Sequence, residues 1–123
     1  MAKWINVTVM DTALAWIRDN TTIVCACGTQ PTAASEATAA TYALGTLAYG
    51  TANWTIGAGD ATGRKITAGA ATITLDASGT VTHFAFTNTG TLVIVGTCAP
   101  TAVTSGGTII MNAFDADEIG TIT

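Results

Sequence analysis

The residues best suited to chemistry are few, and they are scattered along the chain. Three cysteines and one histidine occur, at Cys25, Cys27, Cys98 and His83. Together they could bind a zinc ion, but their spacing matches no zinc finger or zinc ribbon. An odd number of cysteines does not fit a closed disulfide framework, and Cys25 and Cys27 do not form a CxxC motif. We therefore expect small buried thiols, a packed or surface histidine, and no metal site.

The cysteines leave two other arrangements open. Cys25 and Cys27 would point to the same face of a strand. Either thiol could then form a bridge with Cys98 after the protein leaves the reducing cytoplasm. A bridge between two copies of the chain is the other arrangement.

Two further motifs bear on binding chemistry. Segment 57–63 is rich in glycine, but it has neither the spacing of a dinucleotide fingerprint nor the Lys-Ser/Thr pair of a Walker loop. Segment 115–118 holds three carboxylates without the ligand spacing or the glycine of an EF-hand. We predict a flexible connection between strands for the first and a solvated acidic tail for the second. No catalytic residue, cofactor or enzymatic activity is predicted.

The composition favours a surface that is covered in an assembly. Hydrophobic residues make up 49% of the chain and charged residues only 10%, against about 25% charged residues in an ordinary soluble domain. A neighbour can cover a surface of Thr, Ser, Gly, Asn and Ala while few ions lose their water. The alternative is a free monomer with a neutral, threonine-rich coat.

The charges argue against nucleic acid and membranes as partners. The net charge is −4, and Lys3, Arg18, Arg64 and Lys65 form no stripe that could follow a phosphate backbone. No apolar stretch is long enough to span a membrane. The first residues are not followed by the apolar run and cleavage site of a signal peptide. Synthesis in the cytoplasm is therefore expected.

The hydrophobic pattern predicts a single β-rich domain over 1–123 with one helix packed on it. Met10, Leu14 and Ile17 recur at helical spacing, which predicts a helix over 9–19. Asp11 would lie in its first turn, where the helix dipole favours an anion. A helix of this length must pack on the rest of the domain to be stable.

The rest of the chain alternates between strands and glycine-rich turns. Segment 32–41 remains open between a helical turn and a loop. A tight-turn sequence at 76–79 predicts that 71–75 and 80–86 pair as a hairpin, with Gly79 at positive φ. Segment 92–95 is apolar at every position, as expected of a central strand. The expected strands are 22–27, 42–49, 53–56, 64–68, 71–75, 80–86, 92–95 and 108–111, with a partly extended tail over 114–123.

Strands at this spacing, separated by glycine-rich turns, are typical of a sandwich or a barrel. The predicted fold class is mostly β: a small antiparallel β-sandwich, immunoglobulin-like or jelly-roll-like, with a short N-terminal α-helix. The order of the strands is left open by the sequence.

Two stretches of the chain carry a resemblance to a known class of protein. The first is DTALAWIR at 11–18, leading to CACGTQP at 25–31. The second is GTVTHFAF at 79–86, followed by LVIV at 92–95 and SGGT at 105–108. Together they resemble small virion proteins encoded among the structural genes of tailed bacteriophages, over about residues 4–114.

The resemblance implies a virion component rather than an enzyme. It implies a capsid decoration (cement) protein that docks on the major capsid protein and stabilises the shell. Other virion proteins are alternative partners, and self-association is expected, with a trimer as the expectation for a capsid-bound protein. Trp4, the helix face around Trp16, and Trp54 are the candidate interface residues, although Trp16 is also expected in the core.

Two alternatives to capsid decoration remain. The first is a tail-fibre-like, collar or other neck or tail component of the virion. The second is a module that binds host-surface carbohydrate, which would need an exposed aromatic platform built from Tyr42, Tyr49 and Trp54.

Overall fold

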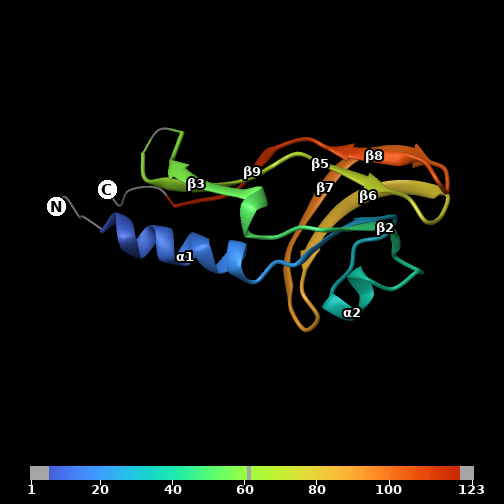
Figure 1. Cartoon of the computed structure of the whole chain (residues 1–123), viewed down its shortest axis with the longest axis horizontal. Coiled ribbons are helices and arrows are strands. Elements are labelled where there is room, and N and C mark those ends of the chain that lie inside the picture. The colour runs from blue at the N-terminus through green and yellow to red at the C-terminus, as the bar shows by residue number, and fades with distance from the viewer. Residues whose placement is uncertain (1–5, 61, 120–123) are drawn as a thin grey trace.

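The computed structural model describes residues 6–60 and 62–119 and is mostly β (Figure 1). Its sheets are antiparallel and a short helix opens the chain, so the predicted fold class is confirmed. No helix in these ranges is long and apolar enough to cross a membrane. In chain order the elements are α1 (Val7–Asp19), β1 (Ile23–Cys27), α2 (Ala34–Ala37), β2 (Ala43–Ala48), the 3-10 turn η1 (Thr51–Asn53), β3 (Trp54–Ala58), β4 (Arg64–Ala68), β5 (Ala71–Thr74), β6 (Gly79–Thr87), β7 (Leu92–Val103), β8 (Thr108–Met111) and β9 (Phe114–Ile119).

The strands described here form three sheets, with the orders β2-β1-β6-β7, β3-β4-β9 and β5-β8. The last two sheets are parts of one long ribbon. Ala68 of β4 lies opposite Phe114 of β9, and Ala71 of β5 lies opposite Met111 of β8, so the same register resumes after a short break. Figure 1 shows this ribbon running the length of the molecule.

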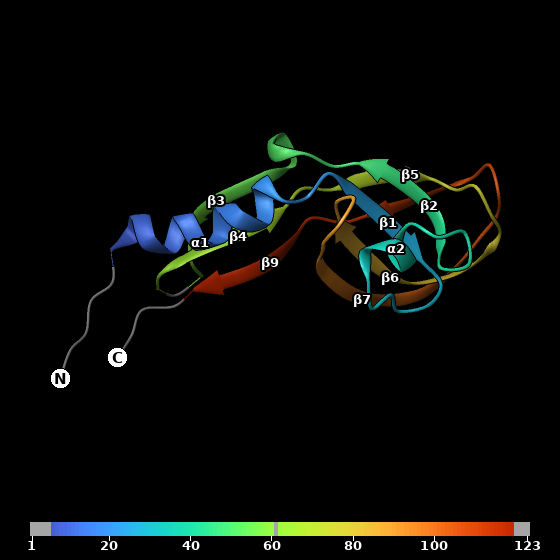
Figure 2. The ribbon, with the colours of Figure 1, turned by 90° about the horizontal axis from the view of Figure 1, so that it is seen from below.

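One half of the molecule consists of α1 packed on the sheet β3-β4-β9 (Figure 2). Met10 and Leu14 are the buried residues of the helix. The Asn6 side chain accepts a hydrogen bond from the Thr8 N–H at 2.8 Å, which caps the first turn. The helix begins at Val7, two residues earlier than predicted, so Asp11 lies beyond the first turn rather than in it.

The other half is a small sandwich in which β5 and β8 cover one face of the four-stranded sheet (Figure 1). Ile73, Ile109 and Met111 of this ribbon pack on Phe84 and Phe86 in one hydrophobic core. The short helix α2 packs on the opposite face of the same sheet, where a second, smaller core forms. Segment 32–41, which the sequence left open, therefore contains one helical turn.

An aromatic cluster lies where the two halves meet. Phe86 packs against Tyr49 and Trp54 with ring centroids 5.3 Å apart, and against Phe114 at 5.8 Å. The buried Tyr49 hydroxyl donates a hydrogen bond to the Gly69 carbonyl at 2.7 Å. Because these residues come from both halves, the cluster fixes one half against the other.

The predicted hairpin between 71–75 and 80–86 is wrong. β5 pairs with β8, whereas β6 pairs with β1 and β7. The residues between β5 and β6 carry the chain from one layer of the sandwich to the other, so they do not form a two-strand turn. Among the described glycines, positive φ occurs at Gly63 and Gly106, and Gly79 does not adopt it.

The prediction of a central strand at 92–95 is also wrong, because β7 lies at the edge of its sheet. Its apolar sequence has another cause. Ile94 packs on the main core, whereas Leu92 and Val95 pack on the smaller core at the opposite face. Both faces of the strand are thus partly covered although one of its edges is free.

The side chains of β6 do not alternate as a regular strand would. The register with β7 shifts between Val81 and His83. Val81 therefore joins Phe84 in the main core, whereas strict alternation would place it on the opposite face with His83 and Ala85.

Candidate interaction surface

The cysteines lie on opposite faces of the four-stranded sheet. Cys25 and Cys27 are fully buried in the small core beside Ala37 of α2. Cys98 is half-buried and packs against the main core on the other face. All three thiols are free. The sheet separates Cys98 from the other two, so the alternative of a bridge between them does not fit this fold. Full burial is confirmed for two of the three.

Burial makes two of the thiols poor nucleophiles. It raises the pKa of Cys25 to about 12 and the pKa of Cys27 to about 11. The pKa of Cys98 is also raised by burial, but this thiol is partly exposed. The thiolate is the reactive form of cysteine. Cys25 and Cys27 should therefore resist thiol reagents for two reasons: they are buried, and their raised pKa keeps them protonated at neutral pH.

We expect a thiol reagent at neutral pH to label Cys98 alone in the native protein, and all three cysteines after unfolding. Mass spectrometry of the labelled peptides measures this directly. The Cys98→Ser variant is the control and should show no native labelling. Labelling of Cys25 or Cys27 at the rate of Cys98 would contradict the burial described here.

His83 lies on β6, opposite Cys27 on one side and Thr97 on the other. Its Nδ1 is 2.8 Å from the Thr82 hydroxyl. Within residues 6–60 and 62–119, no group of three or more His, Cys, Asp or Glu side chains is placed to hold a metal ion.

The acidic run at 115–118 is part of strand β9, so the expectation of a partly extended segment is confirmed, and its three carboxylates are exposed as predicted. It is not a free tail, because β9 pairs with β4. The Lys65 ammonium donates to Asp115 at 3.1 Å and to Asp60 at 2.5 Å. Hydrogen bonding to Lys65 lowers the pKa of Asp115 below its usual range. Glu118 accepts a hydrogen bond from the Asp60 backbone N–H at 2.9 Å. Pairing of β9 with β4 places these carboxylates beside a lysine.

The connection between strands predicted at 57–63 is shorter than expected, because β3 continues to Ala58 and only residues 59–63 link it to β4. The Gly59 N–H donates to the Gly63 carbonyl at 2.9 Å, which closes the turn. Gly63 has a φ of 74°, a conformation that favours glycine.

Charged side chains gather in the half that contains α1. Among the residues that the structure describes, every Asp, Glu, Lys and Arg except Glu36 and Asp76 lies on α1, β4, β9 or the turn before β4. Several of them are paired, as Arg64 and Asp11 are at 2.7 Å. Residues 77–114 contain no charged side chain of these types. The sandwich, with Glu36 and Asp76 as its charges, is called the neutral half below.

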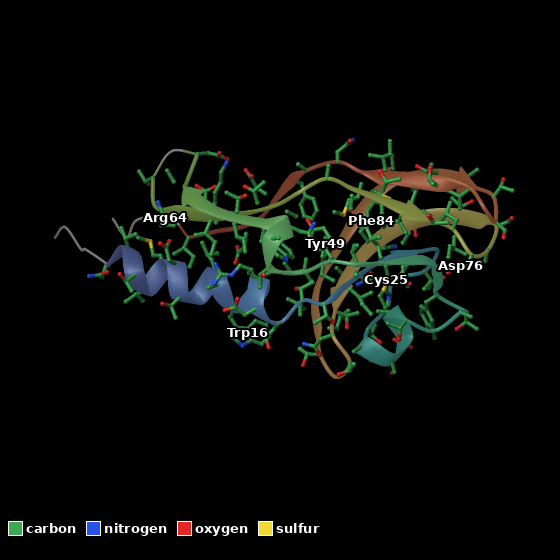
Figure 3. All side chains as sticks on the ribbon, in the orientation of Figure 1. Trp16, Cys25, Tyr49, Arg64, Asp76 and Phe84 are labelled. Carbon is green, nitrogen blue, oxygen red and sulfur yellow. The ribbon has the colours of Figure 1, made fainter. Side chains whose placement is uncertain are left out.

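The three tryptophans occupy different environments. Trp4 lies outside the described residues. Trp16 is 52% exposed, so its predicted place in the core is wrong (Figure 3). Trp54 is 6% exposed and belongs to the aromatic cluster. Of the two described tryptophans proposed as interface residues, Trp16 presents a surface to a partner and Trp54 does not.

Trp16 is part of an apolar stripe on the outer face of α1. The helix packs through Met10 and Leu14. Val9, Ala13 and Trp16 follow each other at helical spacing on a different face, and all three are exposed. These three residues are called the outer stripe of α1.

The aromatic platform expected of a carbohydrate-binding module is not at the surface. Tyr49 and Trp54 are buried. Tyr42 is half-buried, and its hydroxyl donates to Glu36 at 2.8 Å, away from the aromatic cluster. The three rings do not form a common exposed face.

A groove of about 630 Å³ opens between β7 and β8. Phe84, Ile109 and Met111 are buried residues that line it, and half-buried Cys98 and Phe114 also do so. Exposed threonines of β7 and β8 line it as well, and no residue around it is charged. The groove is thus apolar within and neutral throughout.

The opposite side of the sandwich is closed by hydrogen bonds. The Leu44 carbonyl accepts from the backbone N–H groups of Asp76 at 2.8 Å and Ala77 at 3.2 Å. Gly45 forms a β-bridge with Leu75. These contacts join β2 to the end of β5, so the sandwich is sealed at this side and open between β7 and β8.

Comparison with protein-family models, curated proteins and solved structures finds no match. The features that can indicate a function are therefore those of the chain itself: the neutral half, the outer stripe of α1, and the groove. The sequence named the helix face around Trp16, which belongs to the outer stripe, but it named neither the neutral half nor the groove as a site. The long uncharged stretch over 77–114 was a visible signal of the neutral half.

Proposed function

We propose that this protein is a capsid decoration protein of a tailed bacteriophage, which docks on the major capsid protein and stabilises the shell. The observation that carries the proposal is the outer stripe of α1, where Val9, Ala13 and Trp16 are exposed on one face of the helix. The neutral half supports it, because covering such a surface removes water from very few charges. The resemblance of 11–31 and 79–108 to small virion proteins supports the location in a virion.

A decoration protein acts through complementary surfaces. Burying roughly 800 Å² on each partner makes a standard protein interface. Repetition over a symmetric shell then adds many contacts of modest strength, so the shell gains stability through avidity. Neighbouring capsid subunits joined in this way resist the outward pressure of packaged DNA.

The outer stripe of α1 is the surface that we assign to the major capsid protein. Trp16 and Val9 are both more than half exposed on it. Tryptophan is among the residues most often found at the energetic centre of protein interfaces. An apolar stripe on one helix can be received by an apolar groove of a partner.

The copy number in purified particles tests the proposal. Quantitative mass spectrometry should find a number of copies of this chain per particle comparable to the number of major capsid protein subunits. A far smaller number would place the protein at the neck or tail. Its absence from particles would overturn the virion proposal.

We expect Trp16→Ala to weaken binding to capsids by about 30-fold, because loss of an interface tryptophan costs roughly 2 kcal/mol or more. Occupancy on capsids lacking the protein, measured over a titration, provides the readout. Val7→Ala, an exposed position of α1 off the outer stripe, is the matched control and should bind normally. Since the Trp16 side chain is half exposed, the thermal unfolding midpoint of the Trp16→Ala variant should stay close to that of the wild type. Unchanged occupancy would remove Trp16 as an anchor.

A further inference from the structure

We propose that two copies of this chain pair through their β7 strands, so that the two four-stranded sheets join into one antiparallel sheet and the groove beside β7 is covered. The pairing goes beyond the proposed function, because it requires only this chain and would occur without a capsid.

The first argument is the free edge of β7. The strand has β6 on one side and no strand on the other within the described chain. Exposed edges are usually protected by lysine, proline or a bulge. Residues 92–99 contain neither a charge nor a proline. The register with β6 shifts on either side of Ile94–Thr97, so the regular part of the edge is the run from Ile94 to Thr97. This segment therefore presents unpaired backbone groups that a second strand can bind.

The second argument is the difference between the two sides of the sandwich. On the β2 side, the Leu44 carbonyl and Gly45 are already bonded to the end of β5 and its following residues. A strand cannot be added there without breaking these bonds. Head-to-tail pairing of β7 with β2 is therefore blocked at Leu44 and Gly45. Of the two edges of the four-stranded sheet, only the β7 edge is free of such bonds, so two of these sheets can join through β7 and β7. Such an interface uses the same surface twice and closes at two copies.

The third argument is the charge of the partner. The groove and its margin are uncharged, so a segment bearing Asp, Glu, Lys or Arg would lose water there without gaining an ion pair. β7 of a second copy is itself uncharged. The groove and the β7 strand that would cover it are thus both uncharged, so the pairing buries no ion.

The direction of β7 also separates the charges of the two copies. Leu92 lies opposite Thr87, whose carbonyl accepts from the Thr22 N–H just beyond α1. The charged half therefore lies beyond the Leu92 end of β7. Antiparallel pairing places the two charged halves at opposite ends, which limits repulsion between chains of net charge −4.

Gly96 provides the sharpest test. It lies in the regular part of β7 and lines the groove, and a Cβ built on it would meet nothing within 4 Å. A lysine at this position can reach water in the single chain. In the pair it would be confined between two apolar grooves. Gly96→Lys should therefore leave the fold intact and prevent pairing.

Sedimentation velocity over a series of protein concentrations measures the pairing. We expect a weak, reversible dimer for the wild type, and dimerisation at least about tenfold weaker for Gly96→Lys. Gly96→Ala and Thr46→Lys, the latter an exposed position of β2, are the matched controls and should pair as the wild type does. A wild type that stays monomeric throughout, or a dimer lost in Thr46→Lys and kept in Gly96→Lys, would overturn the proposal.

A second measurement needs no variant. Cys98 lines the groove and is half-buried in the single chain. Pairing should slow its reaction with a thiol reagent as the protein concentration rises, and a rate independent of concentration would count against the pair. If the wild type is monomeric and Gly96→Lys instead fails to bind capsids, the groove holds a capsid segment and self-pairing is refuted.

Discussion

Replacing Phe86 with alanine should destabilise the protein by about 3–5 kcal/mol. The side chain is fully buried and packs on Tyr49, Trp54 and Phe114. Its removal would leave a cavity among three rings that cannot readily close. Since a domain is stable by about 5–15 kcal/mol in total, this one change should bring the protein close to unfolding.

Denaturant unfolding followed by tryptophan fluorescence and by far-UV circular dichroism measures the effect. Phe86→Leu is the matched control and should cost clearly less, because it fills most of the space. The aromatic cluster joins the two halves, so both probes should report one transition in the wild type. A cost for Phe86→Ala below about 1 kcal/mol would contradict its place in the core.

The second large effect concerns the sealed side of the sandwich. Gly45→Ala should destabilise the protein by about 1–3 kcal/mol through overpacking. A Cβ at Gly45 would lie 2.5 Å from the Thr74 carbonyl oxygen and 3.2 Å from Ile73 Cγ2. The first contact is with backbone, so β2 and β5 must move apart to relieve it. Amide exchange at Asp76 and Ala77, whose N–H groups bind Leu44, should then accelerate.

Two other glycines separate this close approach from the general effect of alanine in a strand. Gly57 of β3 and Gly96 of β7 have open space where a Cβ would be. Alanine at either position should be neutral or stabilising by up to about 1 kcal/mol, since it restricts the unfolded chain. Equal denaturation midpoints for all three variants would show that the approach of β2 to β5 does not require glycine.

Much of the local structure was predictable because it depends on neighbours in the sequence. The spacing of Met10, Leu14 and Ile17 predicted α1, although its start was placed two residues late. Alternation of apolar residues and threonine predicted β5, and the β-branched run at 22–27 predicted β1. Such patterns indicate which side of a helix or strand is buried, and they can therefore be read without knowing which elements pack together.

The exposed position of Trp16 could also have been predicted from the helical spacing. On a helix packed through Met10 and Leu14, residue 16 falls on a different face together with Val9 and Ala13. The prediction of a core position rested on the aromatic character of Trp16 and not on its position around the helix axis. Helical geometry alone could therefore have placed Trp16 at the surface.

The sequence by itself determined the fold class, most strand positions and the scarcity of charge. Only the tertiary structure decided which strands pair, that β7 is an edge, that the acidic run lies beside Lys65, and that one side of the sandwich stays open. The physical reason is that pairing, edges and grooves arise between segments far apart in the chain. The apolar pattern of β7 is the same for a central strand and for an edge strand covered on both faces, so its free edge could not be predicted from its residues.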